Sequence, residues 1–342
     1  DRLTLKLATL YFQQQNFTDA AALYAEVVPG EENVPPMRNF LVSLLNSGDW
    51  QRAYELASAI RAGGDAIPVI SEVEARVAEY IGDLDLALNL YGQLTELESN
   101  NWEHFLRVAT IRVRQGDIVE AARGLDAVVE RFQNEPRALI EIAKVFAAAN
   151  RPALQILSSA YRARRLDFDN PESHLTYISL FLNHENDSSL ELDPDVIATG
   201  TAVRLSAEDE TVWFTILDQE PIDRGRGEYH FTDPVAQKLI GLSVGEIVDL
   251  KEDSLEDRKY VIDEIQSKFV RAFQETFLSF GSWFPDHPGL HRFKITDNDF
   301  SPIFKVSSMQ LSWLTQMREL YDSGQLTLEG FAQTIGSTVA DV

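Results

Sequence analysis

A Gly-Asp dipeptide recurs every 34 residues in the first part of the chain. It occurs at Gly48-Asp49, Gly82-Asp83 and Gly116-Asp117, and an alanine follows each at the same offset, at Ala53, Ala87 and Ala121. Asn16-Phe17 with Ala20 is an earlier copy, one residue short of the period, and an eroded copy follows from Pro136. A fixed period of this length predicts two-helix units that stack, because neither helix can bury its apolar face alone.

The period and the residue types of the first copy resemble the tetratricopeptide repeat. The family's large and small positions are matched by Leu7, Ala8, Tyr11, Ala20, Tyr24 and Val27. The resemblance implies a right-handed α-solenoid over residues 1–185. Asn170-Pro171-Glu172 begins a further helix, Ser173 to Leu182, which we expect to cap the stack.

The same resemblance implies a concave groove that binds an extended peptide or a helix of a protein partner. It places three arginines on first helices, facing this groove: Arg38, Arg76 and Arg114. They do not reproduce the clamp with which chaperone-binding members hold a C-terminal carboxylate, so that ligand is not inferred. The alternative is structural, each arginine pairing with a carboxylate such as Glu72, Glu79 or Glu103.

The segment from Thr232 to Leu250 predicts a short helix, a turn and a strand. Asp233 or Thr232 can cap the helix, and Pro234 suits its first position because no N–H is needed there. Val235, Ala236, Leu239 and Ile240 form its apolar stripe, and Gly241 stands where a left-handed cap is expected. Val244-Gly245 indicates a turn, and residues 246–250 alternate polar and apolar as a half-buried strand does.

This segment resembles the C-terminal domain of the bacterial Gre transcript-cleavage factors, in a match that extends loosely over residues 198–270. The matching positions are Asp233, where the family has Ser, and Pro234, Val235, Ala236, Leu239, Ile240, Gly241, Gly245, Glu246 and Val248. Further strands are expected at residues 202–205, 211–217, 229–231 and 260–265. The resemblance implies an FKBP-like fold that docks on RNA polymerase. The acidic coiled coil of the Gre factors is absent from the sequence, so transcript cleavage is not expected.

The FKBP-like fold also includes prolyl isomerases, whose pocket is lined by aromatic rings. Trp213, Phe214, Tyr229 and Phe231 could supply such rings, or they could form the core of a small domain. Residues 186–197 are polar and acidic, which predicts a linker between two cores. Residues 271–342 form an aromatic-rich helical extension, with helices expected at Leu311–Tyr321 and Leu328–Ile335.

A short run near the C-terminus, around Leu320-Tyr321 and Gly324, resembles a segment next to PIN-type nucleases in multidomain bacterial proteins. Together these features predict an α+β multidomain protein. An all-α tetratricopeptide solenoid is followed by a small FKBP-like domain of antiparallel sheet plus helix, and then by a helical segment.

Composition restricts the partners. The chain of 342 residues has a net charge of −24, and acidic residues exceed basic ones in each of its parts. Because non-specific nucleic-acid binding depends on Lys and Arg, direct binding of nucleic acid is not expected. There is no cysteine, and no apolar run approaches the ~20 residues that span a bilayer. A cytoplasmic protein that does not bind membranes is therefore expected.

Several clusters of charged residues or histidines are explained by solvent exposure or loop structure rather than by a functional site. Arg162, Arg164 and Arg165 suit a solvated face near a helix end. Acidic runs at residues 208–210 and 252–257 suit soluble hairpin loops. His287 and His291 have the spacing of helical zinc ligands, but Pro288-Gly289 breaks any helix between them. No metal, cofactor or catalytic residue is assigned.

The leading hypothesis is a non-catalytic adaptor, whose solenoid binds a protein partner and whose Gre-like domain docks on RNA polymerase or on a partner domain. Two alternatives stay open. One is the regulatory body of a PIN-type nuclease in a bacterial toxin or phage-defence system, and the other is a prolyl isomerase.

Overall fold

The computed structural model describes residues 2–28, 35–62, 68–187, 190–207, 210–250 and 258–285, with the single residues 287 and 318. The chain divides into two compact units, Asp1–Trp283 and Phe284–Val342, and every element named below lies in the first. The helices predicted after residue 310, the acidic run at 252–257 and His291 lie outside the described residues.

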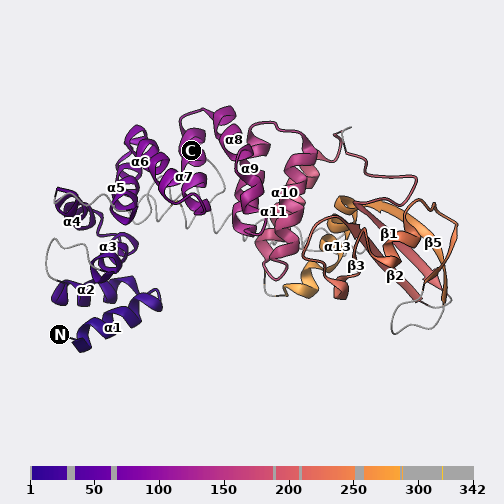
Figure 1. Cartoon of the computed structure of the whole chain (residues 1–342), viewed down its shortest axis with the longest axis horizontal. Coiled ribbons are helices and arrows are strands. Elements are labelled where there is room, and N and C mark those ends of the chain that lie inside the picture. Colours follow the sequence, from indigo (N-terminus) through magenta and orange to yellow (C-terminus); the bar gives the residue numbers. More distant parts are fainter. Residues whose placement is uncertain are drawn as a thin grey trace. The chain divides into compact units, whose positions relative to one another are not determined.

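The first unit begins with helices that pair in chain order (Figure 1). Five hairpins are followed by α11, and the helices are α1 (Arg2–Gln13), α2 (Phe17–Val27), α3 (Pro35–Ser47), α4 (Trp50–Ala62), α5 (Pro68–Ile81), α6 (Leu84–Leu97), α7 (Trp102–Arg114), α8 (Ile118–Asp126), α9 (Pro136–Ala148), α10 (Ala153–Leu166) and α11 (Pro171–His184). A short 3-10 helix, η1 (Val129–Phe132), lies between α8 and α9. This confirms the stack of two-helix units that the period predicts. The further helix α11 begins at its predicted N-cap, Asn170, and packs against α13 rather than ending the stack.

The turn inside each hairpin has the same backbone conformation. Gly48, Gly82 and Gly116 have φ of +86°, +84° and +87°. One period after Gly116, Asn150 takes this place with φ +50°, and Gln15 does so in the first hairpin with φ +59°. The residue after each turn donates its N–H to a carbonyl in the preceding helix, as Asp83 does to Ala78 over 2.8 Å. The recurring glycine is therefore a helix C-cap in the left-handed region.

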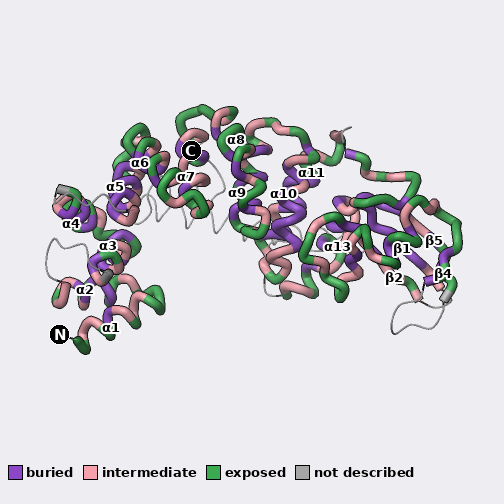
Figure 2. The backbone as a smooth tube through the Cα atoms, viewed as in Figure 1, coloured by how far each residue is buried: buried purple, intermediate pink, exposed green. Residues whose placement is uncertain are grey.

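Alanine lies at the same offset after these turns because the helices cross closely there. Ala20, Ala53 and Ala87 are fully buried, and Ala121 is buried as well. The buried faces run along the inner sides of the helices, as Figure 2 shows in purple. A larger side chain at these positions would overpack the crossing.

The sheet of the first unit has five strands in the order β3-β2-β1-β5-β4. The elements are β1 (Thr201–Ala207), β2 (Glu210–Leu217), η2 (Arg224–Arg226), β3 (Glu228–His230), α12 (Pro234–Leu239), β4 (Ile247–Leu250), β5 (Arg258–Ser267) and α13 (Lys268–Trp283). All five strands were expected from the sequence, and α12 has the predicted cap, since Asp233 accepts a hydrogen bond from the Val235 N–H over 3.1 Å.

The prediction of a purely antiparallel sheet is wrong for one pair. β3 runs parallel to β2, while the pairs β1–β2, β1–β5 and β4–β5 are antiparallel. The connection of residues 218–227 turns the chain back before β3 begins, so both strands run in one direction. Gly227, at φ +70°, ends this connection where a Cβ atom would clash with the Trp213 carbonyl.

Residues 186–197, predicted as a linker between two cores, contribute buried residues to both sides. Leu190 is buried in a core that includes helices α7 to α11 together with Leu217, Phe269 and Ala272. Ile197 is buried in the core of the sheet and donates its N–H to the Leu242 carbonyl. The polar composition of this segment hid its apolar residues, which anchor it on both sides. Helix α13 runs through residue 270, where the sequence placed a domain boundary.

Two glycines test the origin of the repeat period. Gly82 and Gly92 both have open space where a Cβ atom would stand, but only Gly82 is left-handed. We expect Gly82→Ala to lower the free energy of unfolding by about 1 kcal/mol, because alanine is strained at positive φ. Gly92→Ala, within α6, is expected to raise it by about 0.5–1 kcal/mol. Urea unfolding of the two variants checks this, and effects of the same sign would contradict it.

Candidate functional site

The three arginines predicted for the solenoid groove lie on α3, α5 and α7. Arg76 pairs with Glu72 at 3.0 Å and Arg114 with Glu79 at 3.1 Å, and both carboxylates were named in the structural alternative. Arg38 is exposed. Since the sequence separates the three by 38 residues rather than by one period, each lies about 6 Å farther along its helix than the one before. Their role in partner binding stays a prediction.

The expectation that Arg162, Arg164 and Arg165 lie on a solvated face is wrong. All three are buried on α10, with exposed fractions of 7%, 3% and 6%. Their partners lie far along the chain, in the 218–227 connection, in β3 and in α13. Sequence spacing gave no sign of this, because the contacts with these three elements join residues 56 to 112 positions apart.

Arg165 forms a two-point ion pair with Glu228, the first residue of β3. Its Nε donates to Glu228 Oε1 over 2.8 Å and its Nη2 to Oε2 over 2.6 Å. Nη2 also donates to the Pro221 carbonyl over 2.6 Å. Both side chains of the pair are more than nine-tenths buried. A planar guanidinium matches a carboxylate in this geometry, and the additional hydrogen bond satisfies one of its remaining protons.

Arg162 fastens the 218–227 connection without a carboxylate partner. It donates to Gln219 Oε1, to the Glu220 carbonyl and to Asn134 Oδ1, each over 3.0 Å. Together Arg162 and Arg165 hold the connection from the side of the helices. The connection that makes β3 parallel to β2 is thus bound to the last helical hairpin.

Arg164 joins α10 to α11 and α13. Its Nη2 donates to Glu275 Oε2 over 2.6 Å, and its Nε lies within hydrogen-bond distance of Thr276 and of His174 Nδ1. His174 Nε2 contacts the Phe168 carbonyl over 2.7 Å, so the ring donates there and accepts from Arg164 as a neutral imidazole. Burial, with the nearby Arg164 charge, lowers the pKa of His174 to about 4.

A cavity of about 30 Å³ lies between α10, β2 and the first turns of α13. A cavity of this volume has room for about two water molecules. Its charged lining residues are Arg164, Arg226, Lys268, Arg271, Glu228 and Glu275. Aromatic rings also line it, since Arg271 lies 4.4 Å from the ring centre of Trp213 and Arg226 lies 4.2 Å from that of Phe168.

Sequence reasoning missed the residues of this cavity, although one signal was readable. Lys268 and Arg271 stand in the first turn of α13, where acidic residues are favoured by the helix dipole and none occurs. This signal can be recognised only if α13 is predicted to begin at residue 268. The sequence suggested a domain end there instead.

The residues of the Gre-like motif have structural roles. Val235, Ala236 and Leu239 are buried in the core of the sheet, and Ile240 packs against it. Gly241 and Gly245 have φ of +91° and +89°. Asp233 caps α12, and Pro234 is its first residue. These side chains and backbone conformations serve the fold, and a role of the motif in docking stays a prediction.

The four aromatic rings considered for an isomerase pocket do not surround one cavity. Phe214 and Tyr229 pack in the sheet core with ring centres 4.5 Å apart. Trp213, the neighbour of Phe214 on β2, instead lines the cavity between α10, β2 and α13. Phe231 is 37% exposed. The core alternative is therefore correct for Phe214 and Tyr229.

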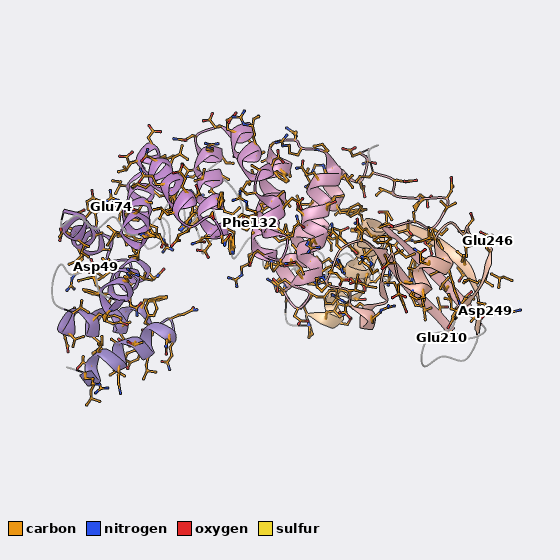
Figure 3. All side chains as sticks on the ribbon, in the orientation of Figure 1. Asp49, Glu74, Phe132, Glu210, Glu246 and Asp249 are labelled. Atoms are coloured by element: carbon orange, nitrogen blue, oxygen red, sulfur yellow. The ribbon has the colours of Figure 1, made fainter. Side chains whose placement is uncertain are left out.

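The described acidic residues at the far end of the sheet do not form a metal site. Glu210, Glu246 and Asp249 are labelled there in Figure 3. Glu246 accepts from the Ser243 N–H over 2.6 Å, which closes the turn before β4. Within the described ranges, no group of three His, Asp or Glu side chains could hold a metal ion. No helix among them is long and apolar enough to cross a membrane.

Comparisons with known proteins reach only distant structures. No protein-family model matches the chain, and no curated protein matches it. Pseudomonas aeruginosa PilF is 13% identical over 54% of this chain and 84% of its own, with a TM-score of 0.45. The C-terminal part of a TPR repeat-containing protein from Cytophaga hutchinsonii is 12% identical over 55% and 74%, with a TM-score of 0.44. YrrB, described as a TPR protein with an unusual peptide-binding site, is 16% identical over 50% and 85%, with a TM-score of 0.38.

The Arg165–Glu228 pair should contribute far more than an exposed ion pair. Arg165→Met would leave the Glu228 carboxylate buried without a counter-charge, so we expect a loss of about 3–5 kcal/mol in the free energy of unfolding. The double variant Arg165→Met/Glu228→Met should recover most of it. The control is Arg123→Met on α8, whose pair with Glu120 is largely exposed and should cost less than about 0.5 kcal/mol. Equal losses for Arg165→Met and Arg123→Met in urea unfolding would refute this.

His174 should make stability depend on pH below neutrality. Its folded pKa of about 4 lies below the unfolded value near 6.5, so the unfolded chain takes up the proton first. The contribution is complete above about pH 6.5 and is lost as the pH falls towards 4, amounting to about 2–4 kcal/mol. We therefore expect wild type to lose more unfolding free energy between pH 7 and 4.5 than His174→Gln. Parallel pH curves for the two proteins would exclude this role of His174.

Proposed function

We propose that the chain is a protein-interaction scaffold, without catalysis in these residues, whose helical hairpins bind a partner protein. The observation that supports this is the stack of five hairpins with one recurring turn. Such a stack exposes one helix of every unit along a continuous surface, which suits the binding of an extended segment.

The arginine line Arg38, Arg76 and Arg114 is our candidate for the partner contact. The three lie on the first helices of consecutive hairpins. Glu79 accepts from both Arg107 and Arg114, so part of the positive charge is already neutralised within the chain. An acidic segment of the partner would therefore compete with Glu72 and Glu79, which favours weak and reversible binding.

The finer hypotheses gain nothing from the described residues. Docking on RNA polymerase is implied only by the Gre resemblance, whose motif residues are structural. The regulatory body of a PIN-type nuclease depends on a segment outside the described residues. Prolyl isomerisation would need an aromatic pocket that Phe214 and Tyr229, as core residues, do not form.

A charge reversal tests the scaffold. Full-length protein carrying Arg38→Glu, Arg76→Glu and Arg114→Glu should lose at least tenfold in affinity for partners that wild type retains from its own cells, because the contact becomes repulsive. The matched control is Arg123→Glu, an exposed arginine on a second helix, which should keep them. Quantitative affinity capture checks this. Retention of the same partners by the triple variant, or their loss from the control, would exclude the arginine line.

A further inference from the structure

The cavity at the start of α13 holds more positive charge than its neighbours neutralise. Around it, Arg164 pairs with Glu275 and Arg226 with Asp223, at 2.6 Å and 2.9 Å. Glu228 is held by Arg165. Lys268 and Arg271 remain. Within the described part of the chain, neither makes a hydrogen bond or an ion pair through its side chain.

These two cations are in an unfavourable environment. Both are half-buried, and burial lowers the pKa of Lys268 and of Arg271. Asp218 acts in the opposite direction on the pKa of Lys268, and Glu275 and then Glu264 do so on that of Arg271, while Arg165 and Arg164 add repulsion. Both cations also lie at the positive end of the dipole of a 16-residue helix. In a chain with a net charge of −24, such a concentration of unneutralised cations needs an explanation.

An anion in the cavity would relieve each of these costs. Four cations and two carboxylates line the cavity, an excess of two positive charges. When each ion pair is removed from the count, Lys268 and Arg271 are the lining cations left without a partner carboxylate. Two positive charges match a phosphate group, which carries about −1.5 to −2 near pH 7, better than a singly charged carboxylate. The N–H groups of Lys268 and Phe269 already donate to Gly200 and Ser267, so the helix contributes through its dipole, and an arginine fork is suited to phosphate oxygens.

We propose that this cavity binds a phosphate group, held by Lys268 and Arg271 at the N-terminus of α13. The site is already ordered for this task. The Arg271 guanidinium lies over the Trp213 ring, and the Lys268 ammonium lies 5.4 Å from the ring centre of Tyr161. Rings that hold the cations in place reduce the entropy lost on binding. Lys268 and Arg271 are only half-buried, so solvent reaches both side chains.

The site stands independently of the scaffold proposal, because a phosphate can bind whether or not the arginine line contacts a partner. It also explains why the cavity lies where three elements meet. Arg164 comes from α10, Trp213 from β2, and Lys268 and Arg271 from α13. A bound phosphate would therefore add a link between the last helical hairpin and the sheet.

The test uses the full-length protein and inorganic phosphate, with sodium chloride at matched ionic strength so that general screening is removed. Wild type should bind phosphate saturably in calorimetry and should melt at a higher temperature in its presence. Lys268→Gln/Arg271→Gln should bind at least tenfold more weakly. The matched control Arg123→Gln/Lys144→Gln removes two exposed, paired cations elsewhere and should bind as wild type does. Arg271→Lys, which keeps the charge but loses the fork, should lie between them.

The melting temperature of the double variant without phosphate shows whether it is folded, so that weaker binding can be assigned to the site. Without phosphate, Lys268→Gln/Arg271→Gln should melt close to wild type, because the relief of repulsion offsets the loss of two cation–ring contacts and no ion pair is removed. With phosphate, wild type should melt higher than the variant. Phosphate that does not bind wild type, or binds the variant and the control equally, would overturn the proposal. Acetate binding as tightly as phosphate would also overturn it, by showing a carboxylate site. O-phosphoserine distinguishes the source: tighter binding than phosphate indicates an esterified group, and weaker binding indicates the free ion.

Discussion

The structure of the first unit depends on the burial of three arginines at the end of α10. A buried guanidinium is costly unless its protons are satisfied, and an opposed charge lowers the cost further. Glu228 provides both for Arg165, and Glu275 with Thr276 for Arg164, while backbone and amide oxygens satisfy the protons of Arg162. The same contacts fix the 218–227 connection and α13. The last helices therefore pack in one core with Leu217 of β2 and with Phe269 and Ala272 of α13, and removing one charge would affect both parts.

The repeat was predictable because its cause is local. A left-handed residue must end each first helix, and glycine or asparagine adopts that conformation at little cost, so the period is written in the sequence. The appearance of Asn150 at the next period, where the sequence has no glycine, follows from the same constraint. The strands were also readable from alternation. The parallel β3 was not, because three residues carry no directional signal and its direction is set by contacts with α10.

The arginines on α10 and the cavity beside them were less predictable, because their contacts are not local in the sequence. The sequence pattern of Arg162 to Arg165 is the same whether a helix end is solvated or covered, and their partners lie tens of residues away. Among the arginines singled out for the groove, Arg76 pairs with Glu72 on its own helix, and Arg114 pairs with Glu79 on α5, as the alternative anticipated. Only the first of these carboxylates can be found by counting along a helix. A cavity assembled from α10, β2 and α13 requires the tertiary fold.

The Gre-like motif shows how far a resemblance of this kind extends. Its proline starts a helix, its aspartate caps it, its aliphatic residues fill the sheet core and its glycines adopt positive φ. Each of these requirements belongs to the fold, and any protein that uses this helix and turn must meet them whatever it binds. Function is instead decided by what differs around the motif. In this chain one distinguishing feature is the place where β3 and α13 meet α10, where Lys268 and Arg271 line a cavity without an ion pair among the described residues.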